Sequence, residues 1–254
     1  MSYTLYHAKG CGSLAVLATL KILDIPHKLA CFMHTPTDFG TTDKTSCKIA
    51  QFPTLVTEDG TVLTEIAACL MYIVQRHGAG TPWSLESLTP SQLAKFYRWM
   101  VFIPANIYPL ITIEDFPSRF VEMPTLSGTE SENFHDWIKK AAIKNKKERY
   151  IILEKNLGQT ATKEYSKGFQ FVLGTEVPSV LDIFVTLILH YAPHPRTQME
   201  WAEENCPGLC FIAKQVLKVP VLKETFVEDE CTAFVEQYEL DNNERATYVQ
   251  DLKM

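Results

Sequence analysis

The segment Gly10-Cys11-Gly12-Ser13 carries the side chains that are best placed to do chemistry. It follows a predicted strand, 3–7, and opens a predicted helix, 12–24. A helix N-terminus carries partial positive charge, so it stabilises a thiolate or another anion. The Ser13 hydroxyl, the Cys11 thiol and the Tyr6 hydroxyl are candidate hydrogen-bond donors to such an anion. The plainer alternatives are that Ser13 is a helix cap and that Cys11 is an inert turn thiol.

The elements around this segment predict a parallel pair of strands. The helix over 12–24 is apolar nearly all round, which is typical of a helix that is covered on most sides. Pro26 ends it, because a proline disfavours the helical conformation of the residue before it. The next strand is predicted over 27–33. A strand, a helix and a strand this close together form a βαβ unit.

A second group of elements completes a small sheet. The stretch 34–51 is irregular, with room for a short helix over 44–50. The runs 54–57 and 61–64 flank Asp59-Gly60, which is a strong hairpin signal. A helix is predicted over 65–77, with Gly78 placed to end it. The sequence therefore predicts a thioredoxin-like α/β domain, βαβ-ββα, with a four-stranded mixed sheet.

The remainder of the chain is predicted to be helical. Residues 79–90 are rich in Gly, Pro, Ser and Thr and read as a linker, and Thr89 and Pro90 are suited to cap and begin the next helix. The predicted organisation is a first domain over 1–78, the linker over 79–90, an all-α domain over 91–228 and an acidic tail over 229–254. The helices are expected at 91–113, 132–157, 179–192, 197–205 and 208–227, with a long loop over 114–131.

Composition excludes several classes of protein. The chain has 254 residues, of which 46% are hydrophobic, so it can bury a sizeable core. Its net charge of −6 gives no field that attracts a phosphate backbone or an anionic membrane. The seven cysteines are scattered and show no CxxC spacing, which is typical of a reducing compartment, so we expect a cytoplasmic protein. No metal site is expected, because Pro193 interrupts the His190 and His194 pair and no further ligand completes it.

Several motifs in register resemble the cytosolic glutathione transferase family, including its fungal and bacterial members. Gln51-Phe52-Pro53 before the hairpin is similar to the family's cis-proline element, and Glu65-Ile66 stands in the place of its Glu/Gln-Ser pair. The Ser179 and Asp182 pair matches the capping box of the family's buried helix, and Gly10 to Ala15 occupies the place of its catalytic residue. The resemblance covers about residues 1–227.

The resemblance implies a glutathione site and assigns roles to particular residues. Ser13 is ranked first and Cys11 second as the residue that stabilises or traps the thiol, whose pKa in a model peptide is near 8.5. Gln51, Phe52, Pro53, Glu65 and Ile66 would hold the glutathione backbone and its γ-glutamyl group. The residues expected to contact a second, small apolar substrate are Tyr6, His7, Tyr97, Phe102 and Tyr108.

Ile66 departs from the family pattern. The hydroxyl residue that the family has there binds the γ-glutamyl carboxylate, and Ile66 has no side-chain donor. A hydrogen bond to a charged group contributes about 1.5–3 kcal/mol, so glutathione affinity is expected to fall by roughly ten- to 150-fold. Binding is weakened by this change but not abolished, because the backbone N–H of Ile66 remains.

Three functions are compatible with these residues. The first is glutathione-dependent conjugation or isomerisation of a small apolar electrophile by a homodimer. The second keeps the fold without the cofactor, as an isomerase, cyclase or dehydratase that uses Ser13, Cys11, Tyr6 or His7 as acid–base groups. The third is a non-catalytic interaction module, which the long loop and the acidic tail mildly favour.

Overall fold

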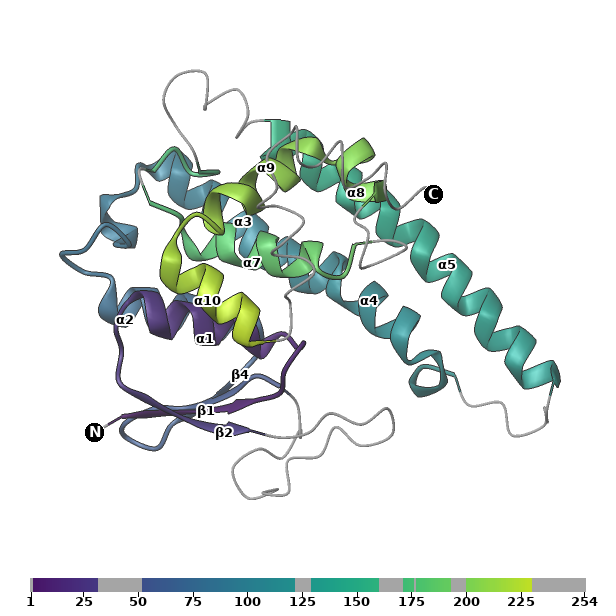
Figure 1. The fold of residues 1–254 in the computed structure, drawn as a ribbon, viewed down its shortest axis with the longest axis horizontal. Coiled ribbons are helices and arrows are strands. Elements are labelled where there is room, and N and C mark those ends of the chain that lie inside the picture. Colours follow the sequence, from purple (N-terminus) through teal and green to yellow (C-terminus); the bar gives the residue numbers. More distant parts are fainter. Residues whose placement is uncertain are drawn as a thin grey trace.

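The structure is a computed structural model that describes residues 2–31, 52–121, 129–159, 171–175, 177–192 and 200–229. A mixed sheet of four strands lies at one end of the molecule (Figure 1). Its strands are β1 (Tyr3–His7), β2 (His27–Cys31), β3 (Thr54–Val56) and β4 (Val62–Thr64), in the spatial order β2-β1-β3-β4. The β1 and β2 strands are parallel, and β3 is antiparallel to both β1 and β4. The predicted thioredoxin-like sheet is confirmed; the short helix expected over 44–50 lies outside the described residues.

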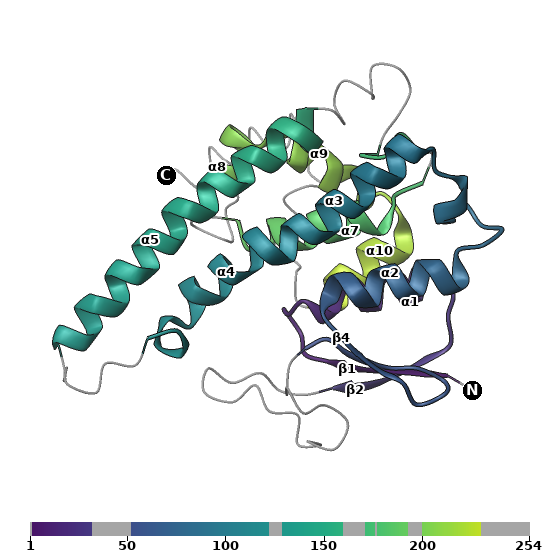
Figure 2. The same cartoon turned by 180° about the vertical axis from the view of Figure 1, so that it is seen from behind.

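Two helices of the first domain lie between the sheet and the helical part of the molecule (Figures 1 and 2). They are α1 (Ser13–Ile22) and α2 (Ile66–His77). Residues 13–20 of α1 are all buried, as its uniformly apolar sequence predicts. The C-terminal helix α10 (Pro220–Glu228) lies alongside α1, and α2 and α7 (Val180–Leu189) also contact it. The first helix is therefore enclosed by parts of the chain that are far apart in sequence.

The second part of the chain is helical, as predicted. It begins with the short turn η1 (Leu85–Ser87) and α3 (Pro90–Asn106), whose N-terminus has a complete capping box between Thr89 and Gln92. The helix α7 runs through its centre with every residue buried, and Ser179 and Asp182 form the predicted capping box at its start. The remaining elements are α4 (Tyr108–Asp115), η2 (Pro117–Arg119), α5 (Thr129–Leu153), a π-helical turn η3 (Glu154–Gly158), α8 (Glu200–Asn205) and α9 (Pro207–Val216).

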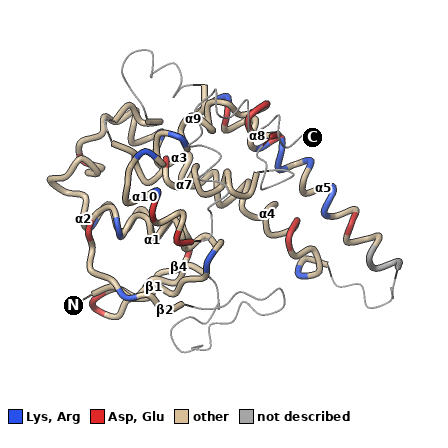
Figure 3. The backbone as a smooth tube through the Cα atoms, in the orientation of Figure 1, with Lys and Arg blue, Asp and Glu red and all other residues tan. Residues whose placement is uncertain are grey.

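The long helix α5 extends well beyond the rest of the molecule, with α4 running beside it (Figure 2). Charged positions of both signs follow one another along α5 (Figure 3). Lys146 is an exception, because its ammonium group is fully buried and pairs with Glu114 of α4. This buried pair joins the end of α4 to α5.

Three predicted segments are divided differently in the structure, and prolines explain two of the divisions. The helical segment over 91–113 is interrupted at Ile107 and continues as α4, because Pro109 has no N–H to continue the hydrogen bonding of the preceding helix. The helix expected over 208–227 is two helices, because Val219 before Pro220 adopts an extended backbone conformation. The loop expected over 114–131 contains the end of α4, the turn η2 and the first residues of α5.

Candidate functional site

The turn between β1 and α1 brings the start of the first helix to the end of the sheet. Gly10 has a φ of +68°, a conformation that favours glycine, and the turn closes with hydrogen bonds from Cys11 N to Ala8 O and from Leu14 N to Cys11 O. Gly12 stands at the N-cap of α1 and has no side chain to cap the helix. The start of α1 therefore has no side-chain cap from its own N-cap residue, and Leu14 N is satisfied within the turn.

Ser13 is turned into the fold. Its side chain is fully buried, and its hydroxyl donates to Ala8 O at 3.1 Å and accepts from Ala8 N at 3.2 Å. A hydroxyl has one proton, and here the backbone receives it. These two hydrogen bonds join the end of β1 to the start of α1. A role for Ser13 as thiol donor stays a prediction and requires this bond to be exchanged.

Cys11 is partly buried in the turn. Burial, followed by the negative charges of Asp229 and Asp115, raises the pKa of the Cys11 thiol to about 11. The thiol is therefore neutral near pH 7. A neutral thiol is a poor nucleophile, so the environment of Cys11 is unlike that of an activated cysteine.

The space above Gly12 is filled from two sides. A Cβ atom at Gly12 would overlap Ile66 Cδ1 and would lie 2.6 Å from the Tyr108 hydroxyl oxygen. A side chain at position 12 would therefore require Ile66 and Tyr108 to move. Ile66 at the start of α2 and Tyr108 at the start of α4 thus converge on the N-terminus of α1.

Tyr108 places a hydroxyl group at this point. Burial strongly raises the pKa of Tyr108, although a side-chain hydrogen bond with Tyr191 opposes the shift. Tyr108 therefore stays protonated throughout the physiological range and acts as a hydrogen-bond donor. The break at Ile107, before Pro109, lets α4 begin at Tyr108, so the same local sequence that ends α3 also positions this hydroxyl.

The start of α2 is open, in contrast to that of α1. Glu65 precedes the helix with φ 67° and ψ 120°, makes no side-chain cap and is exposed. A non-glycine residue at such a φ is strained and is often found where a ligand binds. Ile66, the next residue, is 7% exposed and packs into the core.

The sheet register gathers the predicted glutathione-binding residues at one end. Thr54 of β3 lies between Tyr6 of β1 and Thr64 of β4. Phe52 and Pro53 precede Thr54, and Glu65 follows Thr64, so these segments end side by side next to the α1 turn. The Phe52–Pro53 bond is cis, as expected. Gln51 lies outside the described residues.

The other predicted substrate-binding residues are placed differently. Tyr6 and His7 are buried at the end of β1, at 9% and 4% exposure, and His7 Nε2 lies 2.8 Å from Asp229 Oδ1. Tyr97 is largely exposed and packs edge-on against Phe96, while Phe102 packs against Trp99. Of the three aromatic residues predicted from the first helical segment, Tyr108 is the one that reaches the turn.

Two residues at the site, Tyr191 and Asp229, could not be predicted from the sequence. The Tyr191 hydroxyl donates to Gly10 O at 2.6 Å, and Gly10 N donates to Asp229 Oδ2 at 2.9 Å. Both residues follow the end of a helix, and no local motif distinguishes them. Asp229, expected to begin the tail, is 2% exposed.

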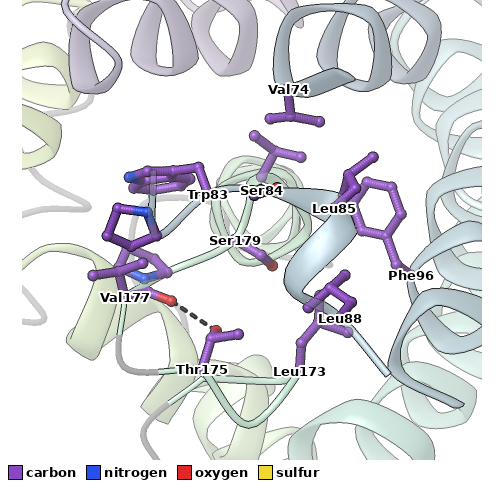
Figure 4. A pocket seen from close by; sticks show the side chains of 13 residues that line it. Val74, Trp83, Ser84, Leu85, Leu88, Phe96, Leu173, Thr175, Val177 and Ser179 are labelled. Carbon is purple, nitrogen blue, oxygen red and sulfur yellow. Dashed lines mark hydrogen bonds between the residues drawn. The ribbon is translucent and has the colours of Figure 1, made fainter. Parts of the chain in front are cut away.

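A separate hollow of about 320 Å³ lies at the opposite end of α2 (Figure 4). Its wall is largely apolar and includes Val74, Trp83, Leu85, Leu88 and Phe96. Its hydroxyl groups come from Ser84, Thr175 and Ser179. Val74 is three residues from the end of α2, whereas the candidate site lies at the start of that helix. The hollow is therefore distinct from the candidate site.

The described residues contain no group of three His, Cys, Asp or Glu side chains arranged to hold a metal ion. Within the same parts of the chain, none of the helices combines the length and the apolar character needed to cross a bilayer.

Comparison with known proteins identifies the fold. No protein-family model matches the sequence. An uncharacterised GST-like protein of Escherichia coli K12, YncG, is 25% identical over 227 residues, which cover 89% of this chain and 97% of that protein. A glutathione transferase homologue from Sulfitobacter, solved with bound glutathione, superposes with a TM-score of 0.70 at 14% identity, over 91% of this chain and 98% of the other.

The chain has the glutathione transferase fold. A homologue from the yeast Lodderomyces elongisporus, solved with two glutathione molecules per subunit, agrees, with a TM-score of 0.67 at 16% identity over 90% of this chain and 99% of the other. The resemblance predicted from the sequence, to fungal and bacterial glutathione transferases, is confirmed by these relatives. The coverage spans the sheet and the helical part together.

Proposed function

We propose that this protein binds glutathione at the junction of β3, α1 and α2 and uses it to conjugate or isomerise a small apolar electrophile, as a cytoplasmic homodimer. Structures of the same fold from Sulfitobacter and Lodderomyces elongisporus contain bound glutathione, which supports this choice of thiol. The domain division proposed with it is 1–78, 79–90 and 91–228, with 229–254 as a tail that begins at a buried residue.

The observation that carries the proposal is the open start of α2. The γ-glutamyl end of glutathione has a carboxylate and an ammonium group. The uncapped N–H groups of Ile66 and Ala67 suit the carboxylate, because a helix N-terminus favours an anion. The exposed carboxylate of Glu65 suits the ammonium group. The carboxylate and the ammonium group of the ligand thus each have a partner within three consecutive residues, 65–67.

The thiol would lie at the start of α1, where it can become a thiolate. The partial positive charge of the helix stabilises the thiolate, and the protonated hydroxyl of Tyr108 is a hydrogen-bond donor near the same point. We place Tyr108 ahead of Ser13 and Cys11 in this role. The Ser13 hydroxyl is fully buried and donates to Ala8 O, and Cys11 is itself a neutral thiol. The Tyr108 hydroxyl lies over Gly12; it is hydrogen-bonded to the Tyr191 hydroxyl, whose own proton goes to Gly10 O, so donation to the thiolate would replace the bond to Tyr191.

The test measures recognition of the γ-glutamyl end. Thermal unfolding and titration calorimetry are run with glutathione and with cysteinylglycine, which keeps the thiol and lacks the γ-glutamyl group. Glutathione is expected to raise the melting temperature at millimolar concentration, because a ligand that binds the native state stabilises it. Cysteinylglycine is expected to leave it unchanged. The proposal would be rejected if both thiols raised the melting temperature equally. It would also be rejected if glutathione at about 10 mM left the melting temperature unchanged.

Ile66 offers a sharper version of the test. Ile66→Ser and Ile66→Ala remove similar bulk from above Gly12, and only the first adds a hydroxyl. The Ser variant should bind glutathione about ten- to 150-fold more tightly than the Ala variant, because the hydroxyl can donate to the γ-glutamyl carboxylate. Calorimetry on both variants measures the difference. Matching affinities would show that the carboxylate does not lie at the start of α2.

A glutathione-independent enzyme is the second candidate, and the packing above Gly12 favours it. Ile66 and Tyr108 fill the space over Gly12, next to the helix start where the first candidate function puts the thiol. In this case Tyr108 and the groups around it would act as acid–base residues on a metabolite. Turnover in glutathione-free buffer distinguishes this candidate, and a strict requirement for glutathione would eliminate it.

A further inference from the structure

Gly10 is held on both of its peptide groups by side chains from the far end of the chain. Its N–H donates to Asp229 Oδ2 at 2.9 Å, and its carbonyl accepts from the Tyr191 hydroxyl at 2.6 Å. These contacts join residues that are 219 and 181 positions apart in the sequence. The turn before α1 is therefore shaped by the helical part of the molecule as well as by its own sequence.

Both side chains are themselves fixed. Asp229 is 2% exposed and pairs with His7, which is 4% exposed, at 2.8 Å. Tyr191 is 6% exposed, and its backbone carbonyl accepts from the buried ammonium group of Lys146 at 2.9 Å. Lys146 in turn pairs with Glu114 of α4. Each anchor thus belongs to a buried polar network with little freedom to move.

The helices that carry the anchors lie against α1. Asp229 directly follows α10, which runs beside α1 in both views of the fold (Figures 1 and 2), and Lys21 of α1 contacts Glu228 at 2.5 Å. Tyr191 follows α7, which also contacts α1, and its ring packs against Tyr108 at a centroid distance of 6.0 Å. The two anchors therefore approach Gly10 from different helices.

We infer that Tyr191 and Asp229 are positioning residues, which fix the direction of the N–H groups at the start of α1. Gly10 and Gly12 would otherwise allow this turn many backbone conformations. Dipoles that stabilise a developing charge are effective when they are held in place beforehand. The inference rests on the proposed function, because the charge to be stabilised is the glutathione thiolate. The helical part of the chain then shapes the thiol site through Tyr191 and Asp229, although neither side chain contacts the thiol itself.

The experiment compares matched pairs of variants in the full-length protein. Tyr191→Phe removes the hydroxyl that donates to the Gly10 carbonyl. Tyr150→Phe removes an equally buried hydroxyl that donates to Ile188 O, a bond made wholly within the helical part. Asp229→Ala removes the second anchor, and Glu228→Ala removes the neighbouring carboxylate from the exposed contact with Lys21.

Two measurements decide the inference. The first is hydrogen exchange of the Gly10 and Cys11 amides without ligand, which we expect to be about tenfold faster in Tyr191→Phe than in Tyr150→Phe. The second is the pKa of the bound glutathione thiol, from the ultraviolet absorbance of the thiolate. We expect Tyr191→Phe and Asp229→Ala to raise it and Tyr150→Phe and Glu228→Ala to leave it at the wild-type value.

The outcomes separate this inference from the proposed function. Exchange at Gly10 and Cys11 that is equal in the two tyrosine variants would overturn it, and so would a thiol pKa that Tyr191→Phe leaves unchanged. A wild-type protein that does not bind glutathione would reject the proposed function. The exchange measurement would still decide whether Tyr191 and Asp229 hold the turn.

Discussion

The starts of α1 and α2 lie next to each other and are built in opposite ways. The start of α1 is closed by hydrogen bonds and by packing. Ser13 is hydrogen-bonded to Ala8, and Gly10 is hydrogen-bonded to Tyr191 and Asp229. Ile66 and Tyr108 cover Gly12. The start of α2 is open, with an exposed Glu65 in a strained conformation and no side-chain cap. Under the proposed function, the start of α2 would receive the charged end of glutathione, while the start of α1 is held by its contacts with the rest of the chain.

The two starts also differ in where their structure comes from. The open start of α2 follows directly from the hairpin and from the residues next to it. The closed start of α1 depends on contacts with residues up to 219 positions away. Substitutions that loosen the start of α1, or that relieve the backbone strain at the start of α2, therefore test whether the two helix starts differ in this way.

Removing Asp229 should have the largest effect. Asp229→Ala leaves His7 buried without its carboxylate partner and Gly10 N without its acceptor. A buried polar group left without its partner costs about 1–3 kcal/mol, and here two are left, so the free energy of unfolding should fall by about 2–6 kcal/mol. Urea unfolding measures it.

Glu228→Ala is the matched control for this change. Glu228 is the preceding residue, and its contact with Lys21 is exposed, so its loss should cost about 0–1 kcal/mol. Similar losses from the two variants would show that Asp229 is not part of the structure that closes α1.

A methyl group on Gly12 should have the next largest effect. Gly12→Ala places a Cβ against Ile66 Cδ1 and the Tyr108 hydroxyl, and such overpacking costs about 1–3 kcal/mol. Combining it with Ile66→Ala should restore part of the loss, because the second change removes the overlapping atom. A double-mutant cycle by urea unfolding measures this coupling, which is expected where residues touch. Strict additivity would contradict the packing described above Gly12.

Relaxing the backbone at Glu65 should have a smaller effect on stability and a clear effect on binding. Glu65→Gly relieves the positive φ and should raise the free energy of unfolding by up to about 1 kcal/mol, offset in part by the flexibility of glycine in the unfolded chain. It should also weaken glutathione binding, because the carboxylate is lost. Thermal unfolding and calorimetry measure the two effects.

Asp24 provides the control for this change, since it also has a positive φ, of 51°, and lies at the opposite end of α1. Asp24→Gly should raise stability similarly and leave glutathione binding as in the wild type. Weakened binding in both variants would argue against a site at Glu65.

Most of the fold could be predicted because its signals are local. The hairpin around Asp59-Gly60, the helix start at Thr89 and Pro90, the capping pair of Ser179 and Asp182, and the apolar surface of α1 each indicate an element within a few residues. The exact position of the interruption at Ile107 and the separation of α9 from α10 at Val219 could not be predicted, because a proline allows either a bend or a new helix.

The candidate site could be predicted only in part. Ser13 was placed correctly at the helix start, but nothing near it indicates that its proton goes to Ala8 O. Tyr191 and Asp229 could not be found at all, because their partner Gly10 lies in another part of the chain and a single glycine carries no signal for side chains that bind its backbone.

Cys11 gives the prediction that perturbs the protein least. Because burial raises its pKa from 9.0 to about 11, its stabilising neutral form is fully present below pH 9, and the stabilisation is lost as the pH rises through 11. At pH 7.5 or nearby, alkylation of Cys11 in the folded protein should be about 100-fold slower than in urea, since the thiolate is the reactive form. Peptide mapping after iodoacetamide treatment measures the two rates and should show the folded rate rising with pH up to about 11. Rapid alkylation at neutral pH would mean that the start of α1 activates this thiol. Cys11 would then replace Tyr108 as the residue proposed to act on the glutathione thiol.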